Sequence, residues 1–156
     1  MKLLYVLRVV AISAEATIVL AAGVGWLFFS PDIQRMASSI QFDEELVKYL
    51  MLVPMGLAIW IVNETRLMLI EDKERLRILT SWPDYWKLKV HAWVGLSYAS
   101  VFGLCSLIPW ATKGSLESGG GLLIFVVTTF GNLIVARGVF AARIRVTEVL
   151  EHGKVA

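Results

Sequence analysis

The chain has 156 residues, of which 57% are hydrophobic and 18% are charged, and its formal net charge is +2. A soluble domain contains roughly 45–50% apolar and about 25% charged residues, so the composition indicates a membrane protein. The many apolar residues exclude intrinsic disorder. The single cysteine, Cys105, excludes a disulfide scaffold, and one cysteine with two histidines provides too few ligands for a typical zinc site.

Four stretches are long and apolar enough to cross the hydrocarbon core, which requires about 20 residues in a helix. They cover approximately residues 3–29, 46–70, 88–110 and 122–142. Backbone N–H and C=O groups cannot stay unpaired in lipid, so each stretch is predicted to be a transmembrane helix. The predicted fold is all-α, with one polytopic membrane domain over 1–156 that forms an antiparallel four-helix bundle.

The first stretch contains Ala14-Glu15-Ala16, which has the small-x-small pattern of a signal-peptide cleavage site. The apolar run nevertheless continues to Phe29, and Arg8 interrupts the core that a signal peptide would need. We therefore expect this stretch to be retained as the first span.

The connection after the first span contains apolar residues at helical spacing. Ile33, Met36, Ala37 and Ile40 follow an i, i+3, i+4, i+7 pattern, and Pro31 suits the first turn of a helix. The pattern predicts a short amphipathic helix that lies on the outer membrane interface.

The basic residues predict the orientation of the bundle. With the N-terminus inside, twelve basic residues lie at the inner helix ends and in the inner connections: Lys2, Arg8, Arg66, Lys73, Arg75, Arg77, Lys87, Lys89, Arg137, Arg143, Arg145 and Lys154. Only Arg35, Lys48 and Lys113 lie outside. By the positive-inside rule, both termini are predicted to be cytoplasmic, and a bacterial inner membrane is the expected location. Acidic residues interleave with the inner basic ones, which argues against nucleic-acid binding.

Polar residues at membrane depth are the first candidates for function, because a charged residue at the middle of a span costs roughly 2.5–3.5 kcal/mol on insertion scales. A rise of about 1.5 Å per residue places Glu15, Ser100 and Asn132 near the midplane. We interpret these three residues as contacts for a partner or an ion. Glu15 has no cation at its own depth, so it is expected to be protonated, bonded to Asn132 or paired with a partner chain.

A second polar layer is expected nearer the cytoplasm. The same rise places Arg8, Asn63, Glu64 and Arg137 at similar depths there. These residues are predicted to form a buried ionic network in which Arg8, Arg137 or both hold the carboxylate of Glu64. Such a network removes the cost of isolated charges, although its net stabilisation can be near zero.

Small residues predict close helix contacts around Glu15. Ala21 and Gly25 form a small-xxx-small pair in the first span, which lets two helices approach closely in lipid. The face of Glu15 is therefore predicted to be directed towards protein. Pro54 is expected to kink the second span.

The sequence contains no nucleophile–base set, phosphate-binding loop, metal-ligand spacing or dinucleotide fingerprint. No catalytic residue, metal or cofactor is predicted, and we favour a non-enzymatic protein that acts by helix–helix interaction in the bilayer. It would be an accessory subunit of a membrane complex or a binder of a membrane-active partner, and the partner is another membrane protein or further copies of the chain. One alternative is a homo-oligomeric unit that transports protons or cations through Glu15. The other is a membrane enzyme on a lipophilic substrate, with Arg66, His91, Tyr98 and Arg137 as candidates.

Overall fold

In the computed structural model, the described residues are 2–40, 44–70, 77, 79–80, 82–111 and 116–153. Within these ranges the chain is helical and contains no β-strand. The helices are α1 (Lys2–Ala11), α2 (Ala14–Ser39), α3 (Glu44–Ile70), α5 (Tyr85–Cys105), α6 (Ile108–Ala111) and α7 (Gly119–Gly153).

Three segments are long and apolar enough to cross a membrane: Ala14–Ser39 of α2, Tyr49–Leu69 of α3 and Gly119–Glu151 of α7. Helix α5 has a comparable length of 21 residues. Its first turns carry two lysines and a histidine, which lower its hydropathy, so it is not one of the three. The fold is thus that of a multi-pass helical membrane protein. The fourth predicted crossing, at 88–110, is not among these three segments.

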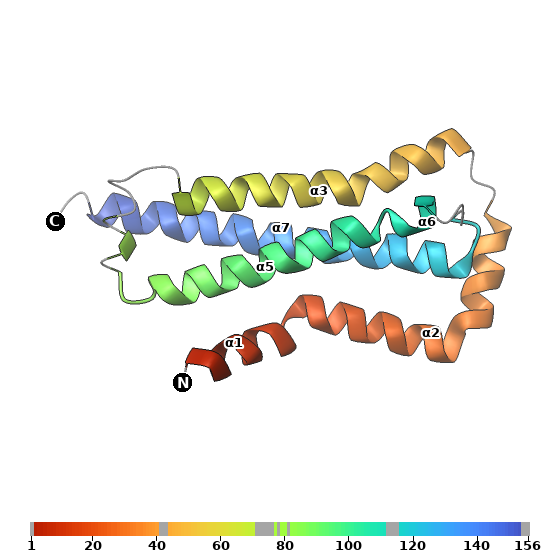
Figure 1. The fold of residues 1–156 in the computed structure, drawn as a ribbon, viewed down its shortest axis with the longest axis horizontal. Helices are drawn as coiled ribbons and strands as arrows, with labels where there is room; N and C mark the ends of the chain where they lie inside the picture. Colours follow the sequence, from red (N-terminus) through yellow and green to blue (C-terminus); the bar gives the residue numbers. More distant parts are fainter. Residues whose placement is uncertain are drawn as a thin grey trace.

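The long helices lie roughly along one common direction. Figure 1 shows α3, α5 and α7 lying side by side, with α1 and α2 along one flank, and the long helices α2, α3, α5 and α7 running alternately in opposite directions. Each of α3, α5 and α7 packs against the other two, whereas α2 packs chiefly against α7 and α1 against α5. The buried core joins the three central helices through Ile61, Ala99, Val135 and Val139, with Tyr98 packed against it.

Glycines let the central helices approach closely. A Cβ atom added at Gly103 of α5 would lie 2.8 Å from the Cβ of Ala58 on α3, and one added at Gly131 of α7 would overlap the ring of Phe102 on α5. Close backbone approach is the usual route to helix association where apolar burial supplies no driving force. The α3–α5 and α5–α7 contacts therefore depend on these two glycines.

The predicted first span is not one continuous helix, because the helix is interrupted between Ala11, the end of α1, and Ala14, the start of α2. Ser13 is the N-cap of α2, and its Oγ accepts a hydrogen bond from the Ala16 N–H at 3.0 Å. The Tyr98 hydroxyl donates to the carbonyl of Val10 at 3.0 Å. Side chains thus satisfy backbone groups that the break leaves without helical partners, which makes a break tolerable in an apolar setting.

The predicted interfacial helix is the bent end of α2. The helix continues through Pro31 to Ser39, and Figure 1 shows its last turns crossing the end of the bundle. There Ala37 is buried, and the Gln34 Oε1 accepts a hydrogen bond from the Gly119 N–H at 2.8 Å. This bond ties the end of α2 to the start of α7.

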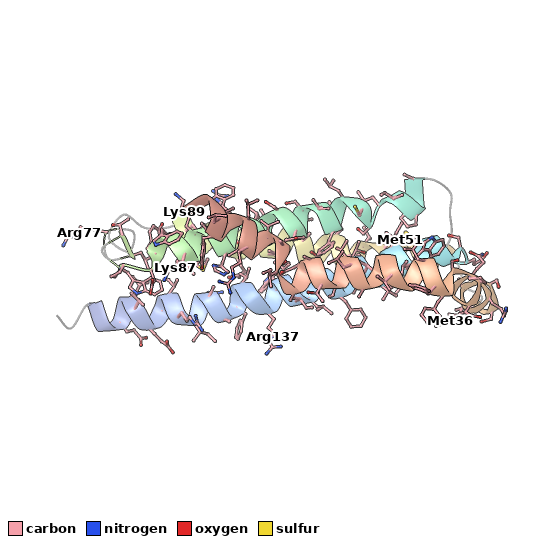
Figure 2. All side chains as sticks on the ribbon, turned by 90° about the horizontal axis from the view of Figure 1, so that it is seen from below. Met36, Met51, Arg77, Lys87, Lys89 and Arg137 are labelled. Carbon is pink, nitrogen blue, oxygen red and sulfur yellow. The ribbon has the colours of Figure 1, made fainter. Side chains whose placement is uncertain are left out.

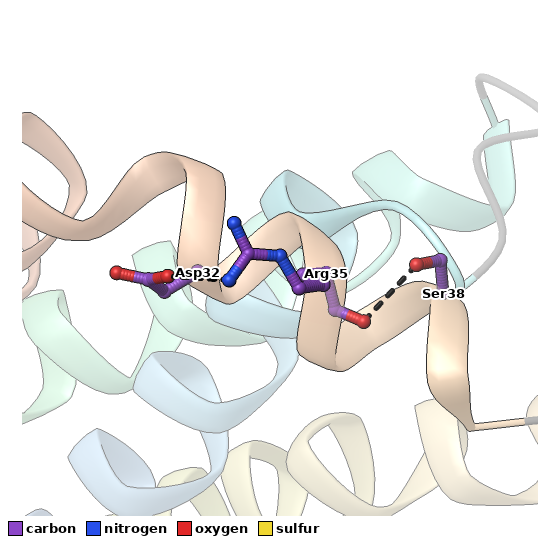
Figure 3. Close-up of polar contacts among 3 residues, drawn as sticks. All are labelled: Asp32, Arg35 and Ser38. Carbon is purple, nitrogen blue, oxygen red and sulfur yellow. Dashed lines mark hydrogen bonds and ion pairs between the residues drawn. The ribbon is translucent and has the colours of Figure 1, made fainter.

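The outward side of this segment is polar. The Arg35 guanidinium lies 3.2 Å from the Asp32 carboxylate, and the Ser38 hydroxyl donates to the Arg35 carbonyl at 3.0 Å (Figure 3). The ion pair is well exposed, so it contributes little stability. It keeps charges on the side of the helix that faces away from the bundle.

The remaining helix boundaries differ from the predicted ones in explicable ways. Helix α5 ends at Cys105 instead of continuing to 110, and a short turn leads to α6, which contains Pro109. A proline ring clashes with the carbonyl four residues earlier, so a straight helix cannot run through this position. Helix α7 extends beyond 142 to Gly153, so it also includes polar turns that follow the apolar stretch.

Candidate functional site

The elbow between α1 and α2 borders a cavity of about 680 Å³ that also touches α5 and α7. Its walls are largely aliphatic, with Val9 and Ile12 from α1 and its end, Val94 from α5, and Ile134 and Val139 from α7. The polar or ionisable residues along it are Tyr5, Arg8, Ser13, Glu15, His91 and Arg137. This cavity is the principal candidate site of the described residues.

Glu15 occupies the first turn of α2, two residues after the Ser13 N-cap. It is half-buried and lines the cavity. The unpaired N–H groups and the dipole of a helix N-terminus favour a negative charge there. Among the described residues no ion pair includes Glu15.

The three residues predicted at the midplane do not form one site. Asn132 is fully buried, and its Nδ2 donates to the Pro54 carbonyl of α3 at 2.8 Å. Ser100 is exposed, and its Oγ donates to the Leu96 carbonyl of its own helix at 2.9 Å. Glu15 lies at the elbow. Asn132 therefore links α3 to α7, while the hydroxyl of Ser100 forms its hydrogen bond within its own helix.

The Asn132 side chain retains one unused acceptor. Its Oδ1 is buried and has no hydrogen-bond partner in the described part of the chain. The amide orientation is nevertheless determined, because the Pro54 carbonyl can only accept and so requires the Nδ2.

The predicted partners of Glu64 are wrong. Its Oε2 lies 2.6 Å from the Nη1 of Arg143, with the side chains 13% and 60% exposed respectively. The other predicted members of the network, Arg8, Asn63 and Arg137, are exposed, and within the described ranges no ion pair joins Arg8 or Arg137 to Glu64. Figure 2 shows the side chain of Arg137 extending from α7 away from the other helices.

The register between α3 and α7 explains this correction. The two helices run in the same direction, and the bond from Asn132 to Pro54 spans 78 positions while that from Arg143 to Glu64 spans 79. Both bonds therefore report one parallel register. The depth count placed Arg137 opposite Glu64, which is an error of about 9 Å at the helical rise.

Tyr5, Trp86 and His91 form a cluster at the cavity, and of these three only His91 was predicted, as a candidate in the membrane-enzyme alternative. The Tyr5 ring packs edge-on against Trp86 at a centroid distance of 5.0 Å and against His91 at 5.9 Å. The Nδ1 of His91 lies 2.8 Å from the Lys87 carbonyl. A carbonyl only accepts, so Nδ1 carries the proton, and in the neutral ring Nε2 remains an acceptor. The sequence signal was the aromatic group at 82–86, whose contact with Tyr5 arises only in the fold.

A second cavity, of about 410 Å³, lies next to this cluster, with Lys87 and Asp84 on its lining. The Lys87 Nζ lies 2.7 Å from the Asp84 Oδ1. The hydrogen bond and charge of Asp84 raise the pKa of Lys87 above its usual value. The described residues contain no group of three or more His, Cys, Asp or Glu side chains that could hold a metal ion.

Fold and site together define a multi-pass helical membrane protein with a cavity at a helix break. No family model matches the chain, and neither a curated protein nor a solved structure matches it. Any function must therefore be inferred from the geometry of this chain.

Proposed function

We propose that the chain crosses a bacterial inner membrane four times with both termini in the cytoplasm. Helix α5 packs along α3 and α7, two helices that are apolar enough to span, and a helix between two spans passes through the same layer. The charged residues of α5 lie in its first turns, where their long side chains reach the interface. The start of α1 and the end of α7 lie towards the same end of the bundle (Figure 1), and the charge bias of the sequence makes that end cytoplasmic.

We further propose that the protein acts without chemistry of its own, by binding a transmembrane helix of another membrane protein through α2. One observation carries this proposal. None of the most apolar 18-residue stretch of α2 is buried inside the chain, whereas 28% of the corresponding stretches of α3 and α7 is buried. Helix α2 thus offers more uncommitted surface than any other candidate span.

The exposed side of α2 suits helix packing. Ala14, Thr17 and Ala21 are exposed and follow one another at helical spacing, and a Cβ atom added at Gly23 would meet no other atom within 4 Å. Small side chains allow the backbone of a second helix to come close, which is how helices associate in lipid.

Glu15 supplies the polar part of the proposed contact. It lies at the start of α2 and has no ion-pair partner among the residues that the structure describes. A partner helix with a basic or amide side chain at this depth would satisfy the carboxylate. The proposed partner is therefore a helix with a small-residue face and one such polar group.

Site-specific photo-crosslinking in intact cells tests this proposal. A photoreactive residue at Ala21 is expected to give one discrete protein adduct, whereas the same residue at Ile59, an exposed position of α3, gives lipid adducts. The adduct at Ala21 should disappear in a Glu15→Ala variant that still accumulates in the membrane. Lipid adducts at both positions would show that α2 faces the bilayer, and an adduct with a second copy of the chain would favour the homo-oligomeric alternative.

A further inference from the structure

The two cavities adjoin each other beside α7 and are together called the groove. They share six lining residues: Tyr5, Leu88, His91, Gly138, Ala141 and Ala142. The larger cavity extends from these residues towards the elbow, and the smaller one extends towards Trp82 at the start of α5. Their volumes, about 680 and 410 Å³, are within the range of known ligand pockets, roughly 300–1,000 Å³.

The two ends of this groove differ in chemistry. The elbow end is bounded mostly by aliphatic side chains, including Val9, Ile12 and Val139. The other end carries Lys87 and Arg145 against a single acidic residue, Asp84. Since Asp84 is paired with Lys87 at 2.7 Å, the cationic end retains the positive charge of Arg145 for a ligand.

The cationic end has the residues of a membrane–water boundary. Trp82 lines it, and Tyr5 packs edge-on against Trp86 at 5.0 Å. Tryptophan and tyrosine rings are enriched at the level of the lipid headgroups. The basic groups therefore lie at headgroup depth, and the aliphatic part of the groove extends into the level of the acyl chains.

Only some of the basic residues of α5 and α7 contribute to this end of the groove. Lys87 and Lys89 lie on opposite sides of α5 (Figure 2), and Lys87 lines the groove while Lys89 does not. Arg137 touches the larger cavity, but its side chain extends outward from α7. The cationic end is thus made by Lys87 and Arg145.

We propose that the groove binds one molecule of an anionic phospholipid. Arg145 and Lys87 hold the phosphate group, because charge-assisted hydrogen bonds from guanidinium and ammonium groups are the strongest that a phosphate accepts. One acyl chain lies along the aliphatic walls towards the elbow. Glu15 and Arg8 border the elbow end of the groove, away from the phosphate. The acyl chain is uncharged there, so the carboxyl group of Glu15 does not repel it.

Native mass spectrometry of the full chain, released from nanodiscs of equal parts phosphatidylglycerol and phosphatidylcholine, tests the headgroup. Phosphatidylglycerol should be retained in preference to phosphatidylcholine. Arg145→Gln should lower its retention about fivefold, the effect of one basic residue at an anionic surface. Arg66→Gln, at an exposed position of α3 that does not line the groove, should leave retention unchanged. Equal retention of both lipids, or equal losses in the two variants, would overturn the proposal.

Inorganic phosphate distinguishes a lipid from a free anion. If the aliphatic half of the groove contributes binding, millimolar phosphate does not displace phosphatidylglycerol. Displacement by phosphate alone would show a simple anion site and would contradict the proposed role of the acyl chain.

Filling the groove tests the acyl chain without changing any charge. A Cβ atom added at Gly138, which both cavities share, would meet nothing within 4 Å, and the same is true at Gly56 on α3. Gly138→Phe should therefore place a ring in the groove without a backbone clash and reduce lipid retention at least tenfold. Gly56→Phe is the matched control and should retain the lipid. Unchanged retention in a folded Gly138→Phe variant would refute the binding mode.

Discussion

A single methyl group added to α7 measures how tightly the central helices pack. In Gly131→Ala, the new Cβ would lie 2.7 Å from the Cδ2 and 2.8 Å from the Cζ of Phe102. Ordinary contacts to a Cβ lie at 3.4–4 Å, so the ring has to move by more than half an ångström. Phe102 is buried, with its ring 5.9 Å from that of Tyr98, which leaves little space for this movement.

The magnitude follows from two opposing effects. Overpacking a well-packed core costs roughly 1–3 kcal/mol, and replacing glycine by alanine inside a helix returns about 0.5–1 kcal/mol. We expect a net destabilisation of about 1–2 kcal/mol for Gly131→Ala. Gly138→Ala, on the same helix, meets no neighbour within 4 Å, so it should be neutral or stabilise by up to about 1 kcal/mol. The difference between the two variants isolates the cost of the clash.

Reversible unfolding in mixed detergent and sodium dodecyl sulfate micelles, followed by circular dichroism, gives the free energy of unfolding of each variant. Labelling of Cys105, the only cysteine of the chain, gives a second probe on α5. The additional replacement Phe102→Leu should relieve part of the cost of Gly131→Ala, because leucine lacks the Cε2 and Cζ atoms that the new methyl group would meet. Equal unfolding free energies for Gly131→Ala and Gly138→Ala would refute the contact between α5 and α7 described above.

Two further predictions use the same unfolding assay. A double-mutant cycle of Glu64→Gln and Arg143→Gln should show a coupling of about 0.5–1 kcal/mol, as for a partly exposed ion pair, whereas a cycle of Glu64→Gln and Arg137→Gln should show none; the reverse order would restore the depth-based pairing. Asn132→Ala should destabilise the protein by roughly 1–3 kcal/mol, since it removes a buried donor from the Pro54 carbonyl, and an unchanged free energy would mean that this hydrogen bond does not fasten α3 to α7.

Composition and the lengths of the apolar stretches were sufficient to predict an all-helical membrane protein. Unpaired backbone groups cannot remain in lipid, so long apolar segments must be helical, and the predicted segment 46–70 agrees closely with α3, Glu44–Ile70. The i, i+3, i+4 pattern after Pro31 likewise indicated a helix before Ile40, but it predicted a separate interfacial helix, whereas the segment is the end of α2.

The helix break at Ser13 could be predicted only in part. Serine is a usual N-cap residue, so Ser13 was a possible helix start. The apolar run on both sides of it nevertheless favoured an unbroken span. The Tyr98 hydroxyl that bonds to the Val10 carbonyl is 88 positions away in the chain. No local pattern reveals that such a distant donor supports the break.

Most of the candidate site was decided by the tertiary structure. The sequence identified Glu15, Asn132 and Glu64 as polar groups at membrane depth, but it paired Glu64 with the wrong arginines and missed Tyr5. A constant rise gives the depth of a residue along its own helix only. The partner of a side chain depends on the offset between two helices and on which face each presents, and these are set by close contacts such as Gly103 on Ala58 and Asn132 on Pro54.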